Sequence, residues 1–423
     1  MLSLNETNGA ASPRSRTTRG VRAALSAATI IATMTVAACG SSGSAGTAAY
    51  SPPPAPAGPV TTIVGLSTIT NLASMVAANK DANPYGLAIV PASFNGLDAS
   101  GAKSVLQPGD LVISDFSNST GANTGTSILL YRPSTGAVMP FYSEHIGAGP
   151  VAVAVSSKGT TWIANYLPGY MNSLDGDSTG DGNVVVITPD GTDFPNNEGI
   201  IDNASGATFS PAADTFAGPW GQAFGVKSGT TTPYFFVTEV DNGTGWVQRE
   251  AFTPPNFDHE TVTTIGYVPV NYNAFDPTGP QGMVYDPATD ILYVASTATN
   301  SIVAFPNATT SPASMTTGVT VYQGSPLNAP VGLTMNPING DLISGNQLDN
   351  NLVEIAPNPY AQGSGYAFSA KLVGTKLVDT TAVNATAGTG SALFGLAASK
   401  DSSGNLMLYF VDDNTNSLDV LKQ

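Results

Sequence analysis

Cysteine is nearly absent from this chain, because Cys39 is the only one in 423 residues. A single cysteine excludes an intramolecular disulfide, so any folded body has to depend on its hydrophobic core. Charged residues are also scarce, at 10%, and 30 Asp and Glu outnumber 14 Lys and Arg. The resulting acidic surface repels phosphate groups, so we expect no nucleic-acid partner.

The usual patterns of catalytic residues are missing as well. The chain has no Gly-x-Ser-x-Gly elbow, no His-x-x-x-His pair and no phosphate-binding glycine loop. It has only two histidines, and His145 is the one candidate for a general base, since it stands just before a predicted turn on the face expected to carry the binding loops. The alternative for His145 is an ordinary surface histidine.

Long apolar runs are absent too, and the best one lies near the N-terminus. Residues Ala23 to Ala38 are apolar and small, but they are too few for the ~20-residue helix that crosses a bilayer. Four arginines precede this run, and Val36-Ala37-Ala38-Cys39-Gly40 ends it. The arrangement resembles the signal peptide and lipobox of bacterial lipoproteins, which implies cleavage after residue 38 and acylation of Cys39 with chains such as palmitate. The alternative is an uncleaved signal anchor with an incidental cysteine.

We therefore predict three segments. Residues 1–38 form a signal peptide, residues 39–59 form a lipidated, Gly/Ser- and Pro-rich tether, and residues 60–423 form the folded domain. The expected location is the bacterial cell envelope outside the cytoplasm, at the outer membrane in a Gram-negative cell. The lipid anchor is the only membrane contact that we expect, and the expected state is a monomer.

What the chain has in abundance is a repeated turn-and-strand phrase, Pro-x-Gly-apolar. Its third positions recur 50 to 69 residues apart, and each copy is followed by short apolar strands. Repeats of this length made of short strands are typical of β-propeller blades. The copies begin at Pro84, Pro150, Pro219, Pro280, Pro330 and Leu393, the second and the last being degenerate.

We predict an all-β, six-bladed propeller in which an N-terminal strand completes the last blade. The last repeat ends at Gln423 after only three strands. Residues Val60 to Ile63 have a sequence similar to that of a predicted fourth strand in another repeat. Pairing the two chain ends closes the ring and removes exposed sheet edges. The segment from Leu72 to Lys80 is then expected to contain a short helix on the way to the first blade.

The phrase Pro-x-Gly-Leu, followed by Leu-Tyr-Val-Ala-Ser and Asn-x-Ile, resembles the NHL-repeat type of six-bladed propeller. Residues 282–305 are the clearest copy. Gluconolactonase, strictosidine-synthase-like and streptogramin-lyase propellers have similar sequence motifs. The resemblance implies the fold, whereas function has to be argued from a site.

Polar residues end the second strand of each blade and are predicted to lie on one face of the ring, where the longer loops gather. In the lactonase-like relatives, acidic and Asn side chains at the channel mouth hold a divalent cation. The resemblance therefore implies a possible Ca²⁺ or other divalent-metal site at Glu239, Asn165, Asn346 and Asp412. The alternative is that these residues only cap the following turns.

Two further candidate sites come from local patterns. Asp175, Asp177, Thr179 and Asp181 have the spacing of a calcium loop, although Val186 replaces its bidentate Glu, so a solvated turn is the alternative. Tyr85, Trp220 and Phe394 occupy the middle of Pro-x-Gly turns and could stack on a sugar or another flat ligand. The alternative for these rings is packing between blades.

The sequence favours a lipid-anchored propeller that acts as a ligand-binding or protein-interaction module of the cell envelope. Its partner would be an envelope protein, a small molecule or a sugar. The alternative is a metal-dependent hydrolase, lactonase or lyase with its site at the channel mouth. No cofactor is assigned from the sequence beyond the candidate cation.

Overall fold

The computed structural model describes most of the chain after residue 57. The described residues are 58–98, 100–118, 124–144, 146, 149–166, 182–195, 200–201, 208–210, 218–240, 245–253, 256–272, 277–362, 365–384 and 389–423.

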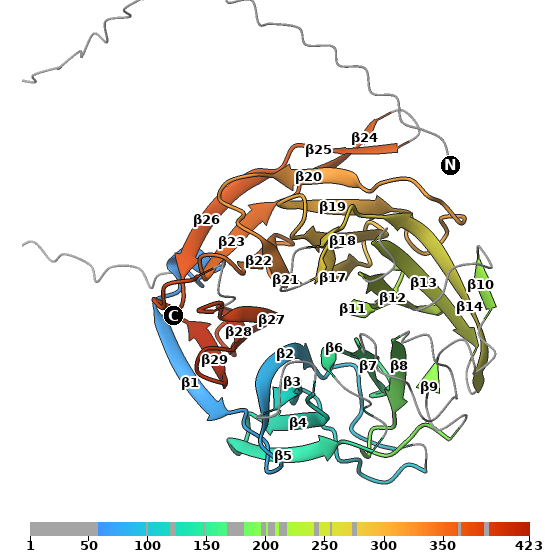
Figure 1. The fold of residues 1–423 in the computed structure, drawn as a ribbon, viewed down its shortest axis with the longest axis vertical. Coiled ribbons are helices and arrows are strands. Elements are labelled where there is room, and N and C mark those ends of the chain that lie inside the picture. The colour runs from blue at the N-terminus through green and yellow to red at the C-terminus, as the bar shows by residue number, and fades with distance from the viewer. Residues whose placement is uncertain are drawn as a thin grey trace, which may run out of the picture. The chain divides into compact units, whose positions relative to one another are not determined.

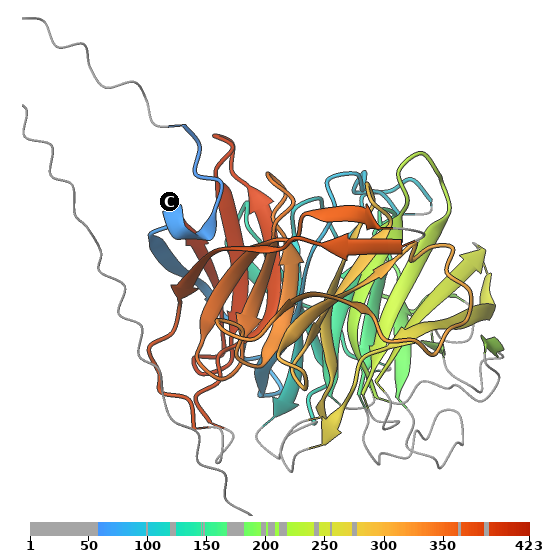
Figure 2. The same ribbon diagram turned by 90° about the horizontal axis from the view of Figure 1, so that it is seen from above.

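Six sheets of mostly four antiparallel strands stand around a central channel (Figure 1). The chain from residue 58 onward is a six-bladed β-propeller. Within each blade the strands run in order from the channel outward, and Figure 2 shows them crossing the thickness of the ring.

The first three blades contain strands β2 to β14. Blade 1 is β2 (Asp81–Ile89), β3 (Leu111–Asn118), β4 (Ser127–Arg132) and β5 (Ala137–Tyr142). Blade 2 is β6 (Pro150–Val155), β7 (Thr161–Asn165), β8 (Asn183–Ile187) and β9 (Ile200–Ile201). Blade 3 is β11 (Pro219–Val226), β12 (Pro233–Glu239), β13 (Trp246–Thr253) and β14 (Asn256–Tyr267), with β10 (Thr208–Ser210) parallel to β14.

The remaining blades contain strands β17 to β29 and β1. Blade 4 is β17 (Pro280–Asp286), β18 (Ile291–Ser296), β19 (Ser301–Pro306) and β20 (Val319–Gln323). Blade 5 is β21 (Pro330–Met335), β22 (Leu342–Asn346), β23 (Asn351–Ala356) and β26 (Lys371–Leu377). Blade 6 is β27 (Leu393–Lys400), β28 (Leu406–Asp412), β29 (Ser417–Lys422) and β1 (Thr68–Ser74). Two small hairpins lie outside the blades: β15 (Asn271–Tyr272) with β16 (Pro277–Thr278), and β24 (Pro359–Gln362) with β25 (Gly365–Phe368).

The predicted closure is confirmed, since β1 pairs antiparallel with β29 from Thr68↔Lys422 to Ser74↔Ser417. The strand itself was placed too early. Residues 60–65 instead cross the ends of blades 5 and 6, where the Val60 carbonyl accepts a 2.8 Å bond from the Leu406 amide. Ile63 opens the 3₁₀ turn η1 (Ile63–Gly65) and is fully buried, so burial of this side chain outweighs its strand propensity.

The short helix expected at 72–80 was also wrong. Residues 72–74 are used by the pairing of β1 with β29, and residues 75–80 form a connection that ends at Lys80 with a φ of 75°. A left-handed residue there ends any helical path. In blade 5, residues 371–377 form the fourth strand.

The Pro-x-Gly motif begins the innermost strand in blades 2 to 5 and lies three residues inside β2 in blade 1, and its proline pairs with a polar residue at or near the end of the second strand. Pro84 faces Asp115, Pro219 faces Glu239 and Pro330 faces Asn346. The motifs and the second-strand ends therefore lie on one face of the ring, as predicted, and we call it the motif face. The opposite side is called the far face.

The glycine of the motif is required by a close approach of the next blade. A Cβ on Gly332 would lie 2.1 Å from the Phe394 carbonyl oxygen, and one on Gly395 would lie 2.5 Å from the Tyr85 carbonyl oxygen. The second contact joins blade 6 to blade 1, so the same packing rule closes the ring. Backbone this close to a neighbour leaves no room for a side chain.

Candidate functional site

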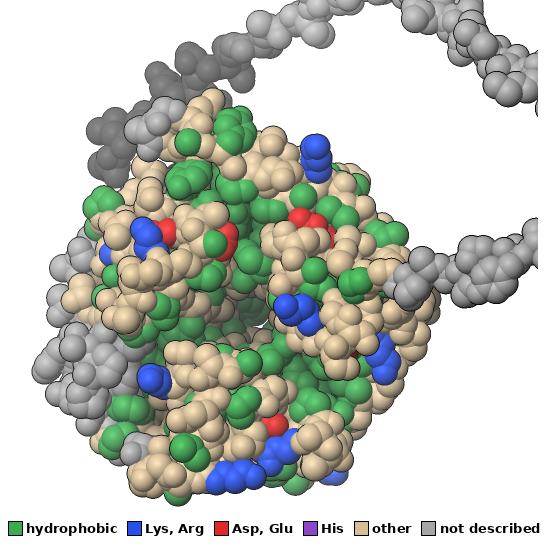
Figure 3. Space-filling model, turned by 180° about the vertical axis from the view of Figure 1, so that it is seen from behind, with side chains coloured by type: hydrophobic (Ala, Val, Ile, Leu, Met, Phe, Trp, Pro, Cys, Tyr) green, Lys and Arg blue, Asp and Glu red, His purple; other side chains and the backbone are tan. Residues whose placement is uncertain are grey.

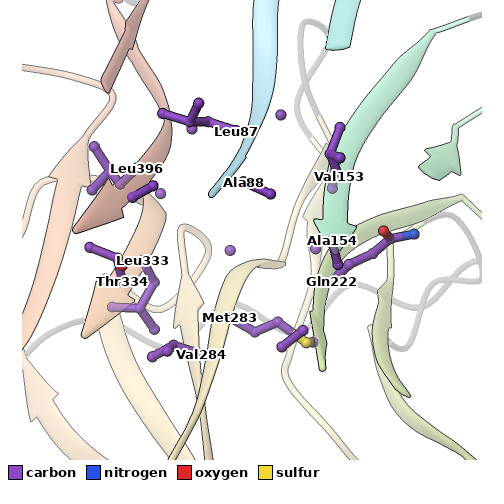
Figure 4. Close-up of a pocket in the computed structure, with 18 of the residues that line it drawn as sticks. Leu87, Ala88, Val153, Ala154, Gln222, Met283, Val284, Leu333, Thr334 and Leu396 are labelled. Atoms are coloured by element: carbon purple, nitrogen blue, oxygen red, sulfur yellow. The ribbon is translucent and has the colours of Figure 1, made fainter. Parts of the chain in front are cut away.

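The innermost strands of all six blades line a central channel of about 330 Å³ (Figure 4). Its wall is made of residues such as Leu87, Val153, Met283, Leu333 and Leu396. No Asp, Glu, Lys, Arg or His is found among the described residues of this wall. Hydrophobic side chains also surround the hollow that is visible at the centre of the face drawn in Figure 3.

Few polar side chains reach the channel. Gln222 lies in its wall, and with its amide oriented to satisfy both ends it bonds the Trp162 carbonyl at 2.9 Å and the Ala164 amide at 2.8 Å. The hydroxyl of Tyr285 donates to Asp290 at 3.0 Å. Gln222 therefore joins blade 3 to blade 2, Tyr285 bonds within blade 4, and most side chains of the channel wall are apolar.

The motif end of the channel is filled by the middle residues of the Pro-x-Gly turns. The Tyr85 ring stacks on Phe394 at 3.8 Å and on Phe116 at 4.4 Å between centroids. Trp220 packs edge-on against Tyr85 at 6.2 Å and against Tyr166 at 5.2 Å. All five rings are at most 7% exposed.

These rings form one apolar cluster with Val151 and Val331, the corresponding residues of blades 2 and 5. We predicted from the sequence that three rings could stack on a ligand: Tyr85, Trp220 and Phe394. In the structure these rings stack on one another or on neighbouring rings. Their role toward a ligand stays a prediction. Their packing stabilises the closed ring, since each aromatic pair adds about 0.5–1.5 kcal/mol beyond burial.

The polar residues that end the second strands are buried inside their own blades. Asn165 donates to the Asn183 side chain at 2.8 Å. Asn346 donates to the Pro326 carbonyl at 2.8 Å and to the Asp349 carboxylate at 3.0 Å. Contacts of this kind hold the neighbouring turns, as the capping interpretation predicts.

Asp412 accepts a bond from the Thr415 amide at 3.2 Å, and burial raises the pKa of its carboxyl. Glu239 is fully buried in blade 3. The four residues named as cation ligands thus stand in four different blades, and within the described residues no three His, Cys, Asp or Glu side chains come together to hold a metal. A shared cation site does not follow from this arrangement and stays a prediction.

Asp115, at the corresponding position of blade 1, has a different environment. Its carboxyl is fully buried, and neither oxygen has a hydrogen-bond partner within the part of the chain that the structure describes. Burial, together with the nearby Asp81 carboxylate, raises its pKa to about 8. The group therefore holds its proton at neutral pH. Nothing in the sequence distinguishes Asp115 from the polar residues at the corresponding positions of the other blades.

Several predicted residues lie outside the described part of the chain. They are Cys39, His145 and the calcium-like run with Asp175, Asp177, Thr179 and Asp181. Asn183, at the end of that run, is described and begins β8.

None of the described helices is long and apolar enough to cross a membrane. No family model matches the chain, and no curated protein matches it.

Solved structures to which this chain is similar include three bacterial proteins. A 6-phosphogluconolactonase from Bacteroides uniformis, described as putative, is 17% identical, with 80% of this chain and 85% of that one covered and a TM-score of 0.44. The periplasmic gluconolactonase of Pseudomonas aeruginosa is 14% identical, with coverage of 73% and 80% and a TM-score of 0.43. The aldose sugar dehydrogenase of Streptomyces coelicolor is 15% identical, with coverage of 84% and 98% and a TM-score of 0.44. The likeness concerns the fold, and no substrate follows from it.

Proposed function

We propose that the chain is a lipid-anchored propeller that acts outside the cytoplasm as a ligand-binding module of the cell envelope. The anchor is inferred from the lipobox-like residues around Cys39. A tether of residues 40–58, if extended at about 3.1 Å per residue, would let the ring stand up to ~60 Å from the membrane.

The observation that carries the binding role is the channel. It is concave, reaches about 330 Å³, and its described side chains are mostly apolar and include no charged group. Apolar cavities of this size bind neutral, apolar small molecules, because burial of their surface is favourable by about 25 cal/mol per Å². The packed rings at the motif end make the far face the side from which a ligand enters.

A neutral fluorescent probe tests this role. N-phenyl-1-naphthylamine brightens in apolar surroundings, and we expect saturable binding with a Kd of roughly 1–100 μM. Ala88 lies half-buried in the channel wall, so Ala88→Phe fills the channel and should abolish the signal. The matched control is Ala361→Phe on the outer hairpin, where Ala361 is exposed. Equal probe binding by both variants would show that the channel is not the site.

A hydrolase with its site at the motif face is the second candidate function, and Asp115 is the observation that favours it. Buried carboxyls with raised pKa values and no partner are common at catalytic sites. Metal analysis of the purified protein before and after chelation, with thermal unfolding as readout, separates the two functions. Bound metal whose removal lowers Tm would support the hydrolase, whereas no metal and an unchanged Tm would support the binding module.

A further inference from the structure

The far face carries a second hollow that is independent of the channel. It has a volume of about 840 Å³ and lies between the β2–β3 connection of blade 1 and two turns of blade 2. We call it the far-face groove. Its lining includes Ser93, Asn95, Asp98, Lys158, Asp190 and Phe194.

The groove exists because one connection is long. In the other five blades the first and second strands are joined by four to six residues, whereas residues 90–110 join β2 to β3. Long ordered loops on a rigid scaffold usually serve binding, because they add nothing to a blade that already has its strands.

The long connection is fixed to blade 2. Phe94 and Leu106 are buried at 3% and 0% exposure, and the Leu106 amide donates to the Pro189 carbonyl at 3.0 Å. The Val105 amide donates to the Asp190 carboxylate at 3.2 Å, and Arg132 of blade 1 holds the same C-terminal part of the connection through Asp110 at 2.7 Å. The groove is thus a preformed site, which lowers the entropic cost of binding.

The lining chemistry suits a polyhydroxylated ligand. Six residues of the lining carry a side-chain hydroxyl: Ser93, Ser100, Ser157, Thr160, Thr188 and Thr192. Each hydroxyl has one donor and two acceptor positions, so pairs such as Thr188 and Thr192, bonded to each other at 2.8 Å, keep capacity for a ligand. Phe194 is half-buried and adds an aromatic surface for the apolar face of a sugar ring.

The charges exclude other ligand classes. Two carboxylates, Asp98 and Asp190, stand against one ammonium group, Lys158, so an anionic ligand meets net repulsion. A purely apolar ligand would cover these three charged groups without giving them hydrogen-bond partners, which is unfavourable. We infer that the far-face groove binds a neutral oligosaccharide, with the carboxylates accepting hydrogen bonds from its hydroxyls.

Calorimetric titration with neutral tetrasaccharides built of glucose, mannose, galactose or N-acetylglucosamine tests this inference. We expect at least one of them to bind with a Kd below about 1 mM. Phe194→Leu keeps apolar bulk but loses the flat ring, and Thr192→Trp obstructs the groove at an exposed position. Both should weaken binding at least about tenfold. Tyr360→Leu, at an aromatic residue that is 48% exposed on the β24–β25 hairpin, should not.

Three results would overturn the inference: no tetrasaccharide binds, tetragalacturonate binds more tightly than every neutral sugar, or both groove variants bind as the unchanged protein does. Thermal unfolding of each variant shows whether it still folds. If one of the two groove variants does not fold, the binding measured with the other groove variant tests the inference. Channel binding of N-phenyl-1-naphthylamine is measured in parallel. A groove that fails while the channel still binds its probe leaves the proposed function intact, and the reverse result leaves the groove intact.

Discussion

The close approach between neighbouring blades leads to a quantitative prediction for Gly332. A Cβ at this position would stand 2.1 Å from the Phe394 carbonyl oxygen and 2.9 Å from a Leu396 side-chain carbon. Ordinary carbon–oxygen contacts are about 3.3 Å or longer, so the two blades would have to separate by ~1 Å. The obstructing atom belongs to the backbone, and no rotamer change can relieve the clash.

Overpacking of this kind costs about 1–3 kcal/mol, and more where the backbone cannot move. The folded part, residues 58–423, unfolds with an entropy of roughly 0.8 kcal/mol per K, at about 2.1 cal/mol/K for each residue. A cost near 3 kcal/mol therefore lowers Tm by about 4 °C for Gly332→Ala. Differential scanning calorimetry measures this directly, and urea unfolding gives the free-energy difference.

Gly365→Ala is the matched control, because the nearest atom to its added Cβ is the Gln362 carbonyl oxygen at 3.9 Å. We expect its Tm to stay within about 1 °C of the unchanged protein. The reasoning is refuted if Gly332→Ala unfolds at the same temperature as Gly365→Ala. The two blades could then move apart far enough to accept a Cβ without a cost in stability.

Three further predictions concern closure, the anchor and pH. Removal of residues 58–74 takes away β1 and should give insoluble protein, whereas removal of residues 1–57 should leave a soluble one; equal solubility of the two proteins would argue against closure by β1. Cys39→Ala should abolish incorporation of labelled palmitate and move the protein from the membrane to the soluble fraction, and a protein that stays in the membrane fraction would contradict the anchor. The Asp115 pKa of about 8 lies above its ordinary value of 3.8, so the folded state binds the extra proton and stability falls as pH rises from about 4 to about 8. Asp115→Asn removes this dependence and should stabilise the protein by on the order of 4 kcal/mol at pH 7, and a stability difference that does not grow between pH 5 and pH 8 would disprove the shift.

Most of the fold could be predicted from the sequence because propeller blades repeat. The Pro-x-Gly phrase placed the inner strands, and the polar residues after each second strand marked the correct face. The closing strand was misplaced because Val60–Ile63 and Thr68–Ser74 have similar strand propensity. What separates them is tertiary: Ile63 is buried, and its amide bonds the Glu354 carboxylate at 2.8 Å.

The sites were harder to predict because they depend on contacts between blades. Tyr85, Trp220 and Phe394 are 135 and 174 residues apart in sequence, so their meeting at one end of the channel follows only from the closed ring. The far-face groove likewise joins residues near 95 to residues near 190. The unusual length of the 91–108 connection is visible in the sequence and indicates that this loop differs from its counterparts. The length does not show what the connection packs against.

The packing of the two faces explains where ligands have room. At the motif face, the glycines draw the inner strands together and the rings of Tyr85, Phe394 and Trp220 occupy the space that is left. Toward the far face, wall residues that remain half-buried, such as Ala88 and Thr334, border open volume. The same end of the ring carries the long connection of blade 1 and its groove. If the channel and the groove bind as proposed, stability and binding use opposite ends of the same strands, and substitutions that loosen the motif face should lower Tm before they change what the far face binds.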